Sequence, residues 1–591
     1  GDAELVDATH DSRQVRPGWL FCATPGAARD GHAFAASAAA AGAAALLVER
    51  WLDLDIPQAR VHSVRRAMGP VAAAIHGHPS QRLNVVGVTG TNGKTTTTHL
   101  LEAAFGAAGL GTGVIGTIET RIHGGVYQSG VHTTPEATDL QRLLALMEAR
   151  GVDAVAMEVS SHGLDQHRVD GTLYEVAVFT NLTQDHLDYH GTLETYYATK
   201  ARLFGPELAI RGVVRVDDEW GRRLAREATV PLTTFGTSPD ARTRVVDIVS
   251  DLRGTRCRLV GNDSSVLLRT RLLGAHNALN AAAAYLAATC AGVPADAAVA
   301  GIAACEGVPG RLEPIVAGQP FAVLVDYAHT PDALARVVDA CRRFTRPGGR
   351  LHVVVGCGGE RDRAKRTVMG RIAAEAGRAV LTSDNPRSED PDAILAEAAA
   401  GAEAVVGSHV VVEPDRRRAI TIALAGARPG DVVLIAGKGH ETTQELARHI
   451  IPFDDRSVAA EILVELGWEG PEARAGGEIW DGQQDRPGGR PGERSWSSER
   501  SWSSERSWPD EGSDRIDQGS DRIDQGSDRM AQERDRIHQG SDRMAQERDG
   551  FDQRQGPQAR AGGSFKAATE AGGTPQGPRA VRGGGGRSDP S

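Results

Sequence analysis

The sequence predicts an α/β fold with parallel sheets, and two patterns indicate it. From residue 321 onward, short apolar runs alternate with helix-like runs, as expected for β-α-β units in a parallel sheet. Earlier, the apolar run at residues 85–88 leads into a glycine-rich turn at residues 89–96 and a helical run at 100–104. Both patterns place a strand directly before a helix, which is the repeating unit of this fold class.

The expected elements follow one another along the first 467 residues. The segment up to about residue 82 contains two strand-like runs and alanine-rich helical stretches. The middle part adds strands at residues 85–88, 152–159 and 176–180 and an alanine-rich helix at 277–288. In the last part, strands are expected at residues 321–325, 351–355, 379–381, 410–412 and 432–435.

The composition argues against several classes of protein. A net charge of −11 gives no basis for general nucleic-acid binding. The six cysteines form no Cys-x-x-Cys pair, which fits the reducing cytoplasm. The most apolar stretch, residues 33–48, is too short and too rich in alanine to span a membrane. We expect no signal peptide, and because the chain starts at Gly1 rather than Met, we expect that an N-terminal piece is missing.

Residues 468–591 differ from the rest of the chain and consist mainly of Gly, Ser, Arg, Asp and Gln. A seven-residue repeat in this tail raises the alternative of a coiled coil. Each repeat unit offers only one Ile or Met together with a Gly, whereas a coiled-coil seam needs two apolar positions per heptad. We therefore predict a disordered tail, so the 591 residues make three folded domains rather than four.

Polar clusters follow six of the expected strands. They lie at residues 158–162, 181–186, 326–330, 356–361, 383–387 and 437–441. Open α/β sheets bind their ligands outside the carboxyl ends of the strands. The sequence therefore predicts a binding site built from these strand ends.

The glycine-rich turn at residues 89–96 predicts a phosphate-binding loop. Backbone N–H groups and the start of the following helix would hold the phosphates, Lys94 would neutralise their charge, and Thr95 would bind Mg²⁺. The strict P-loop pattern requires a glycine where this chain has Val88, so the sequence departs from it. The flanking strand and helix still favour the prediction over a chance Lys-Thr pair.

Two further strand-end residues, Glu158 and His186, are candidate Mg²⁺ partners. Mg²⁺ prefers oxygen ligands and often shares substrate phosphates, so the histidine is the less usual ligand. Taken alone, either residue could be an ordinary polar group. From its local sequence, Lys200 is expected to be a solvated helix lysine.

Residues 87–96 resemble the ATP loop of the Mur ligases, which build the stem peptide of peptidoglycan. Motifs at residues 157–168, 181–191, 309–313, 326–331 and 437–441 resemble the branch of this family that adds diaminopimelate as the third amino acid. The resemblance covers nearly all of residues 10–467 and implies three domains: a UDP-binding domain at 1–83, a P-loop ATP-binding domain at 84–310 and a Rossmann-like, amino-acid-binding domain at 311–467. The tail, residues 468–591, has no counterpart in the family.

The resemblance also implies an activity. ATP would phosphorylate the D-Glu side-chain carboxylate of UDP-N-acetylmuramoyl-L-alanyl-D-glutamate, and the amine of meso-diaminopimelate would attack the acyl phosphate to give an amide, ADP and phosphate. It implies an enzyme that uses Mg²⁺ and ATP, with small-molecule substrates. From the composition we expect a cytoplasmic protein with neither a nucleic-acid nor a membrane partner, and we expect a monomer.

The resemblance assigns roles to individual residues. For ATP they are Gly90, Thr91, Asn92, Gly93, Lys94, Thr95, Thr96, Asn277, Arg311, Asp326 and His329. For the UDP-muramoyl dipeptide they are Ser12, Thr133, Thr134, Ser160, Gln166 and Arg168. For diaminopimelate they are Arg361, Asp384, Asn385, Pro386, Arg387, Gly437 and Glu441. Metal ligands would be Thr95, Glu158, His186 and Lys200, and the catalytic set would be Lys94, Glu158, His186 and Lys200. In the family the lysine at Lys200 is carbamylated, which overturns its local interpretation as a solvated side chain.

The choice of amino acid depends on residues 384–387, which match the signature of diaminopimelate-adding members. The guanidinium of Arg387 suits the extra carboxylate of diaminopimelate, and Glu441 would receive its distal ammonium. The alternatives are the same ligase adding L-lysine, a folate-polyglutamylating ligase and a non-catalytic nucleotide-binding scaffold. A lysine-adding member is expected to lack Arg387. His276, Arg215 and Leu312 depart from the family's usual Phe, Asn and Met.

We predict that a chain cut after about residue 470 keeps full activity, because the tail lies outside the three folded domains. Phosphate release by the truncated and full-length chains measures this. Loss of turnover or of solubility on truncation would show that the tail contributes.

Overall fold

The computed structural model describes residues 3–26, 29–130, 132–261, 264–360 and 362–468, and within them parallel sheets are flanked by helices, as the α/β prediction requires. The predicted disorder of the tail falls on residues outside this described part, apart from Trp468. Within the described ranges, no helix combines the length and apolar character needed to cross a membrane.

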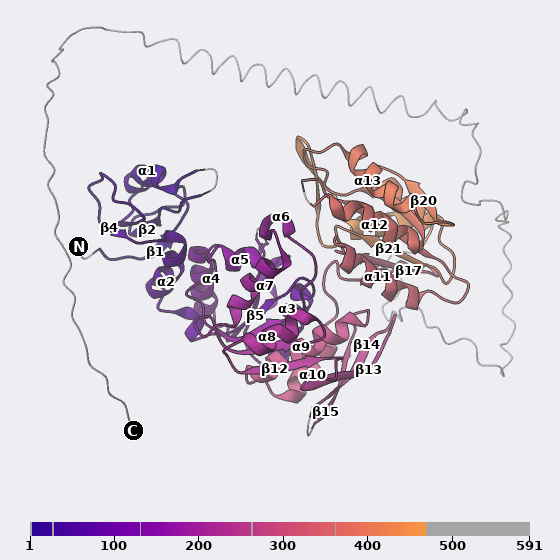
Figure 1. Cartoon of the computed structure of the whole chain (residues 1–591), viewed down its shortest axis with the longest axis horizontal. Coiled ribbons are helices and arrows are strands. Elements are labelled where there is room, and N and C mark those ends of the chain that lie inside the picture. The colour runs from indigo at the N-terminus through magenta and orange to yellow at the C-terminus, as the bar shows by residue number, and fades with distance from the viewer. Residues whose placement is uncertain (1–2, 27–28, 131, 262–263, 361, 469–591) are drawn as a thin grey trace, which may run out of the picture. The chain divides into compact units, whose positions relative to one another are not determined.

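The first sheet is small, with parallel strands in sequence order. It contains β1 (Asp7–Thr9), β2 (Trp19–Cys22), β3 (Ala45–Val48) and β4 (Gln58–Arg60), with the short helices η1 (Gly31–Phe34) and η2 (Pro79–Gln81) nearby. Leu46 and Val48 pack against α1 (Ala35–Ala40), whereas Ala45 and Leu47 pack against α2 (Val64–Ile75), because successive strand residues face opposite sides. Figure 1 shows these two helices on opposite faces of the sheet. The sequence predicted only two of these four strands.

The second sheet begins with the predicted strand before the glycine-rich turn, now β5 (Asn84–Thr89). Its order is β15-β14-β13-β12-β11-β10-β5-β9-β6-β7-β8, parallel from β13 through β6 and antiparallel at both ends. The other strands are β6 (Thr112–Ile115), β7 (Glu119–Ile122), β8 (Gly125–Ser129), β9 (Ala154–Glu158), β10 (Tyr174–Phe179), β11 (Ala209–Arg215), β12 (Leu232–Gly236), β13 (Thr243–Asp251), β14 (Gly254–Val260) and β15 (Ser265–Thr270).

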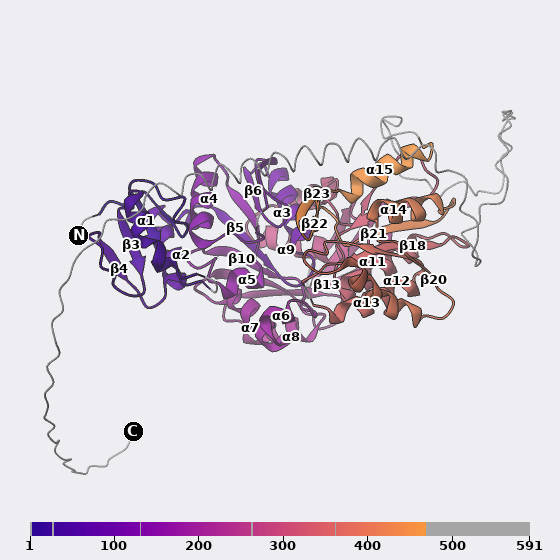
Figure 2. The same ribbon diagram turned by 90° about the horizontal axis from the view of Figure 1, so that it is seen from above.

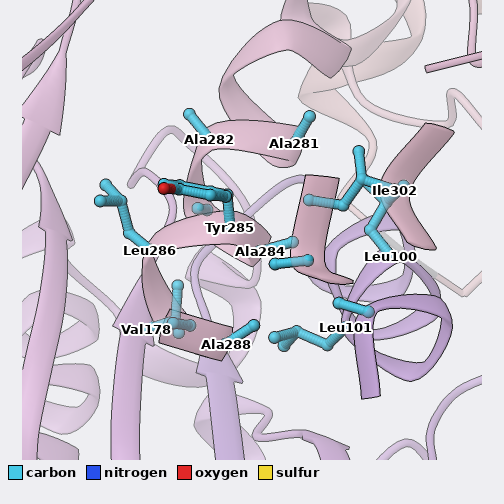
Figure 3. Packing of buried hydrophobic residues seen from close by; sticks show 14 of the residues in the cluster. Leu100, Leu101, Val178, Ala281, Ala282, Ala284, Tyr285, Leu286, Ala288 and Ile302 are labelled. Carbon is cyan, nitrogen blue, oxygen red and sulfur yellow. The ribbon is translucent and has the colours of Figure 1, made fainter. Parts of the chain in front are cut away.

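Helices cover both faces of the second sheet. One face packs against α3 (Lys94–Ala107), α9 (His276–Cys290) and α10 (Ala295–Ala304). The small side chains of α9 let it lie close to Leu100 and Leu101 of α3 and to Val178 of β10 (Figure 3). The other helices of this domain are α4 (Ala137–Ala149), α5 (Ser161–Asp165), α6 (Leu187–His190), α7 (Leu193–Ala201), η3 (Arg202–Phe204) and α8 (Glu219–Glu227).

The third sheet has the order β16-β17-β21-β18-β19-β20, with all but β16 parallel. Its strands are β16 (Glu313–Pro314), β17 (Ala322–Asp326), β18 (Leu351–Cys357), β19 (Gly377–Ser383), β20 (His409–Val412) and β21 (Val432–Ala436). The bounds of β17 to β21 lie within two residues of the five predicted strands, whereas β16 was not predicted. A separate hairpin, also not predicted, joins β22 (Thr443–Leu446) to β23 (His449–Pro452). The strand formed last in the sequence, β21, lies between the first two parallel strands. Polar segments that follow β17, β21 and β18 are therefore neighbours.

The two faces of the third sheet carry different helices, as Figure 2 shows. One face packs against α11 (Pro331–Phe344), α12 (Ala364–Glu375) and α13 (Pro391–Glu403), and the other against α14 (Arg416–Ala425) and α15 (Asp455–Glu465). Val353 and Val355 face the first set and Val354 the second. The predicted domain boundaries after residues 83 and 310 fall between the three sheets and remain a prediction.

A buried ion pair joins α14 to α15. Arg416 Nε and Nη2 each donate to a different oxygen of Asp455 at 2.7 Å, and both side chains are 0% exposed. Arg416 Nη2 also donates to the Ala436 carbonyl at 3.0 Å, at the end of β21. The pair therefore fixes both helices to the edge of the sheet where the polar segments lie.

Replacing Asp455 with Asn is expected to lower the free energy of unfolding of this domain by about 3–5 kcal/mol, because it leaves the Arg416 guanidinium buried without a counter-charge. Urea-induced unfolding followed by circular dichroism measures the loss. The matched control is Glu461→Gln, which removes one exposed partner of Arg417 and is expected to cost below about 1 kcal/mol. Equal losses in the two variants would contradict the prediction.

Candidate active site

One cavity of about 970 Å³ collects most of the predicted site residues. Those that line it are Thr91, Asn92, Gly93, Lys94, Thr95, Thr96, Thr133, Thr134, Glu158, Ser160, Gln166, Arg168, His186, Lys200, Arg311, Asp326, His329, Asn385, Arg387 and Glu441. Most of them lie on segments that follow strands of the second and third sheets, where open α/β sheets bind ligands, whereas Lys200 comes from α7 and Arg311 precedes β16.

The predicted phosphate loop joins β5 to α3, and two glycines explain its course. Gly90 has φ +145° and Gly93 has φ +90°, values that favour glycine. A Cβ at Gly90 would lie 2.0 Å from Thr180 Oγ1, and one at Gly93 would lie 2.5 Å from Asn280 Oδ1. The close packing leaves the N-terminus of α3 open to the cavity, an arrangement suited to binding phosphate.

Two lysines meet at the Gly90 carbonyl. Lys94 Nζ donates to the carbonyls of Gly90 at 2.9 Å and Thr91 at 2.8 Å, and Lys200 Nζ donates to the same Gly90 oxygen at 3.1 Å. Burial, with Lys94 close by, lowers the pKa of Lys200 well below its ordinary value. The interpretation of Lys200 as a solvated helix lysine is wrong: it is 1% exposed and its ammonium lies 4.6 Å from the centre of the Tyr196 ring.

Glu158 and His186 have different surroundings. Glu158, at the end of β9, accepts hydrogen bonds from the backbone N–H and the hydroxyl of Thr117 at 2.9 and 3.0 Å. His186 lies 3.3 Å from Asp185 at its Nε2, and burial lowers the pKa of its imidazole to about 4 despite that carboxylate. His186 is therefore neutral near pH 7, with a nitrogen lone pair available to a ligand.

These residues fit a Mg²⁺ ion that is shared with phosphate oxygens. Glu158 offers carboxylate oxygens, Thr95 a hydroxyl and His186 a neutral ring nitrogen, and all three line the cavity beside the phosphate loop. Among the described residues, no group of three His, Cys, Asp or Glu side chains is placed to hold a metal by itself. The fit therefore depends on additional oxygens from a bound phosphate.

The third domain contributes to the phosphate side of the cavity. Arg311 Nη2 donates to Thr95 Oγ1 at 3.1 Å, and the central carbon of its guanidinium lies 4.7 Å from the centre of the Tyr327 ring. Burial raises the pKa of Asp326 to about 6, although Arg311 opposes this, and burial lowers the pKa of His329. His329, whose neutral form is favoured by burial, and Arg311 thus line the cavity together with the phosphate loop.

A second part of the cavity wall holds the residues predicted for the muramoyl dipeptide. Thr134 Oγ1 donates to the Glu158 carbonyl at 3.0 Å, and Ser160 caps α5. Arg168 donates to Gln166 Oε1 at 2.7 Å and to the Thr134 carbonyl at 3.0 Å, and it lies 3.1 Å from Glu136. The Arg168 guanidinium is therefore oriented before any ligand binds, as a carboxylate-binding group requires.

The residues predicted to bind diaminopimelate lie at the ends of β19 and β21. Arg387 Nη1 donates to the Gly359 carbonyl at 2.8 Å, and its Nε pairs with Glu445 at 2.8 Å. Asn385 Nδ2 donates to Glu441 Oε2 at 2.8 Å. The predicted companion Arg361 lies outside the described residues.

Several predicted residues do not line the cavity. They are Ser12, Gly90, Asn277, Asp384, Pro386 and Gly437. Gly90 contributes its carbonyl oxygen, which accepts a hydrogen bond from Lys94 Nζ. Asn277 lies behind the cavity wall, and its Oδ1 accepts a hydrogen bond from Asn280 Nδ2 at 2.8 Å. The structure does not bring Ser12 to this cavity.

The sequence analysis missed three residues that position the site. Asn280 lines the wall beside Gly93, Glu136 pairs with Arg168, and Asp332 accepts from Asn92 Nδ2 at 3.0 Å. Asp332 could have been found as the acidic residue in the first turn of α11. Asn280 and Glu136 had no recognisable pattern. The departures His276 and Arg215 also line the cavity, and burial lowers the pKa of His276 to about 4.

The chain belongs to the Mur ligase family. Family models match it at residues 8–86 (Mur ligase family, catalytic domain), 88–288 (Mur ligase middle domain) and 310–439 (Mur ligase, glutamate ligase domain). A UDP-N-acetylmuramoyl-L-alanyl-D-glutamate–2,6-diaminopimelate ligase from Streptomyces avermitilis is 49% identical over 475 residues, 78% of this chain and 93% of that protein. The enzyme of the same name from Geobacillus kaustophilus is 44% identical over 478 residues, 79% and 96% of the two chains.

Solved structures agree with this assignment. A UDP-N-acetylmuramoyl-L-alanyl-D-glutamate–2,6-diaminopimelate ligase matches with a TM-score of 0.59 at 34% identity, covering 78% of this chain and 95% of that one. The MurF ligase of Thermotoga maritima in complex with ADP matches with a TM-score of 0.54 at 21% identity, covering 79% and 98%. The second likeness shows a shared fold alone.

Proposed function

We propose that the chain is an ATP-dependent ligase that joins meso-2,6-diaminopimelate to UDP-N-acetylmuramoyl-L-alanyl-D-glutamate, a step of peptidoglycan precursor synthesis. The main observation is the single cavity that unites a phosphate loop, an oriented Arg168 and the Asn385–Glu441 pair. Relatives with this activity in their names match nearly their full length. The phosphate loop, Arg168 and the Asn385–Glu441 pair, each suited to a different substrate, line the same cavity.

The proposed reaction has two steps. A carboxylate oxygen of the D-Glu side chain attacks the γ-phosphorus of ATP, and the bond to ADP breaks. The amine of diaminopimelate then attacks the acyl carbon, phosphate leaves with its bonding electrons, and the new amide loses a proton. Lys94 and Arg311 neutralise phosphate charge, Arg168 orients the dipeptide, and Arg387 and Glu441 bind the two distal charges of diaminopimelate.

We propose that Thr95, Glu158, His186 and a carbamylated Lys200 hold Mg²⁺, which supplies charge neutralisation for the phosphates when bound. The lowered pKa of Lys200 supports this, because a neutral amine can bond to the carbon of CO₂ and lose a proton to give an anionic carbamate. A new carbonyl resonance after incubation with ¹³C-bicarbonate, absent in Lys200→Ala, would identify the modification. Absence of that resonance in the wild type would refute it.

The cytoplasm is the proposed compartment, since the reaction consumes ATP and the six cysteines are free thiols. A monomer is the proposed state, because one chain supplies every described residue of the cavity wall.

The test is phosphate release with ATP, UDP-N-acetylmuramoyl-L-alanyl-D-glutamate and either meso-diaminopimelate or L-lysine. We expect turnover that depends on diaminopimelate. Equal or greater turnover with lysine would contradict the proposed specificity, and no turnover with either amino acid would favour the scaffold alternative.

A further inference from the structure

A fully buried lysine lies behind the amino-acid side of the cavity. Lys438, in the turn after β21, is 0% exposed and is not part of the cavity wall, whereas its partners Asn385 and Glu441 are. Burying an ammonium group costs several kcal/mol unless partners compensate it. The contacts of Lys438 must therefore offset this cost.

The contacts of Lys438 connect the two wall residues. Lys438 Nζ donates to Asn385 Oδ1 at 3.0 Å and to Glu441 Oε2 at 3.0 Å. Asn385 Oδ1 also accepts from the Glu445 backbone N–H at 3.0 Å. Because an amide oxygen must face these two donors, the Asn385 NH₂ group must face Glu441, where it donates to Oε2 at 2.8 Å.

The hydrogen bonds to the Glu441 carboxylate therefore fix only one of its two oxygens. Both of its hydrogen bonds, from Lys438 and Asn385, reach Oε2. Among the described residues, Oε1 is thus the oxygen that remains for a ligand in the cavity. This oxygen belongs to a side chain that lines the same cavity as Arg387.

The charged groups around Glu441 shift its pKa in opposite directions. Burial and the neighbouring Asp384 raise the pKa of Glu441, and Lys438 lowers it. Arg416, on α14, also faces both carboxylates, but it is already paired with Asp455. Lys438 is therefore the cation in hydrogen-bonding contact with Glu441 that favours its ionised form.

We propose that Lys438 is a positioning residue for the incoming amino acid, which orients Asn385 and keeps Glu441 charged for the distal ammonium of diaminopimelate. This inference rests on the proposed function. Without the lysine, Glu441 would lose the cation that lowers its pKa, and its neutral form, which attracts an ammonium group far less, would be favoured.

The test compares the wild type with Lys438→Gln, which keeps a hydrogen-bond donor but removes the charge. The KM for diaminopimelate is measured from about pH 6 to about pH 9, together with the KM for ATP. We expect the variant-to-wild-type ratio of KM for diaminopimelate to be largest at low pH and to fall by up to about tenfold per pH unit. The KM for ATP should stay unchanged.

Three controls make the outcome decisive. Arg417→Met removes an exposed cation of the same domain and should leave every KM unchanged. The analogue 2-aminopimelate lacks the distal amine, so its KM should not respond to Lys438→Gln. Lys438→Met, an apolar replacement of a buried ion, gives the same measurement if the Gln variant does not fold.

A ratio of KM that does not change with pH would overturn the proposal, and so would a Lys438→Gln enzyme indistinguishable from the wild type. Both results would leave the ligase assignment intact, because the wild type would still use diaminopimelate. Failure of the wild type to use diaminopimelate would instead refute the proposed function.

Discussion

Replacing Lys94 with Ala is expected to abolish turnover, with a loss of at least about 10³-fold in kcat. The side chain lies across the phosphate loop, with its ammonium on the Gly90 and Thr91 carbonyls, where it can reach a transferring phosphoryl group. Removal of this charge leaves the developing charge on the phosphate oxygens less stabilised. Phosphate release under saturating substrates measures the effect.

Two further variants test whether the effect of Lys94 is local. Lys94→Arg keeps the positive charge and should retain more activity than Lys94→Ala. Arg226→Ala removes an exposed cation from α8, far along the chain from the loop, and should leave the rate unchanged. A near-normal rate for Lys94→Ala would refute the assigned role.

Replacing Arg387 with Ala is expected to raise the KM for diaminopimelate by about 10- to 100-fold, because hydrogen bonds to charged groups contribute about 1.5–3 kcal/mol. The KM for ATP should not change, since Arg387 comes from the end of β19 and the phosphate loop from the end of β5. Initial rates with each substrate varied in turn measure both constants.

Arg387→Lys is the matched variant, since it keeps the charge and loses the planar fork. Its KM for diaminopimelate should lie between those of the wild type and Arg387→Ala. If the KM of Arg387→Ala is unchanged, Arg387 does not bind the extra carboxylate.

Features that depend on local backbone geometry could be predicted from the sequence. The phosphate loop was predictable because Gly90 and Gly93 adopt backbone conformations that few other residues tolerate. The five parallel strands of the third sheet were predictable because each is a short apolar run between polar segments, whereas the two-residue β16 has no such pattern. The function came from the resemblance of the strand-end motifs to one family.

Features that depend on tertiary packing could not be predicted in this way. The local sequence of Lys200 suits an exposed helix, and only the packing of α7 beside the phosphate loop buries it. The pairing of Glu136 with Arg168 joins residues 32 positions apart in the chain without any motif. The order of strands in the third sheet was likewise beyond the sequence pattern.

That strand order has a consequence for the chain during its synthesis on the ribosome. Because β21 lies between β17 and β18, a nascent chain that ends before Val432 leaves those two strands without their shared neighbour. Residues 322–431 therefore keep exposed sheet edges until the five-residue strand β21 leaves the ribosome. We expect the third domain to be open to aggregation and to chaperone binding during this interval.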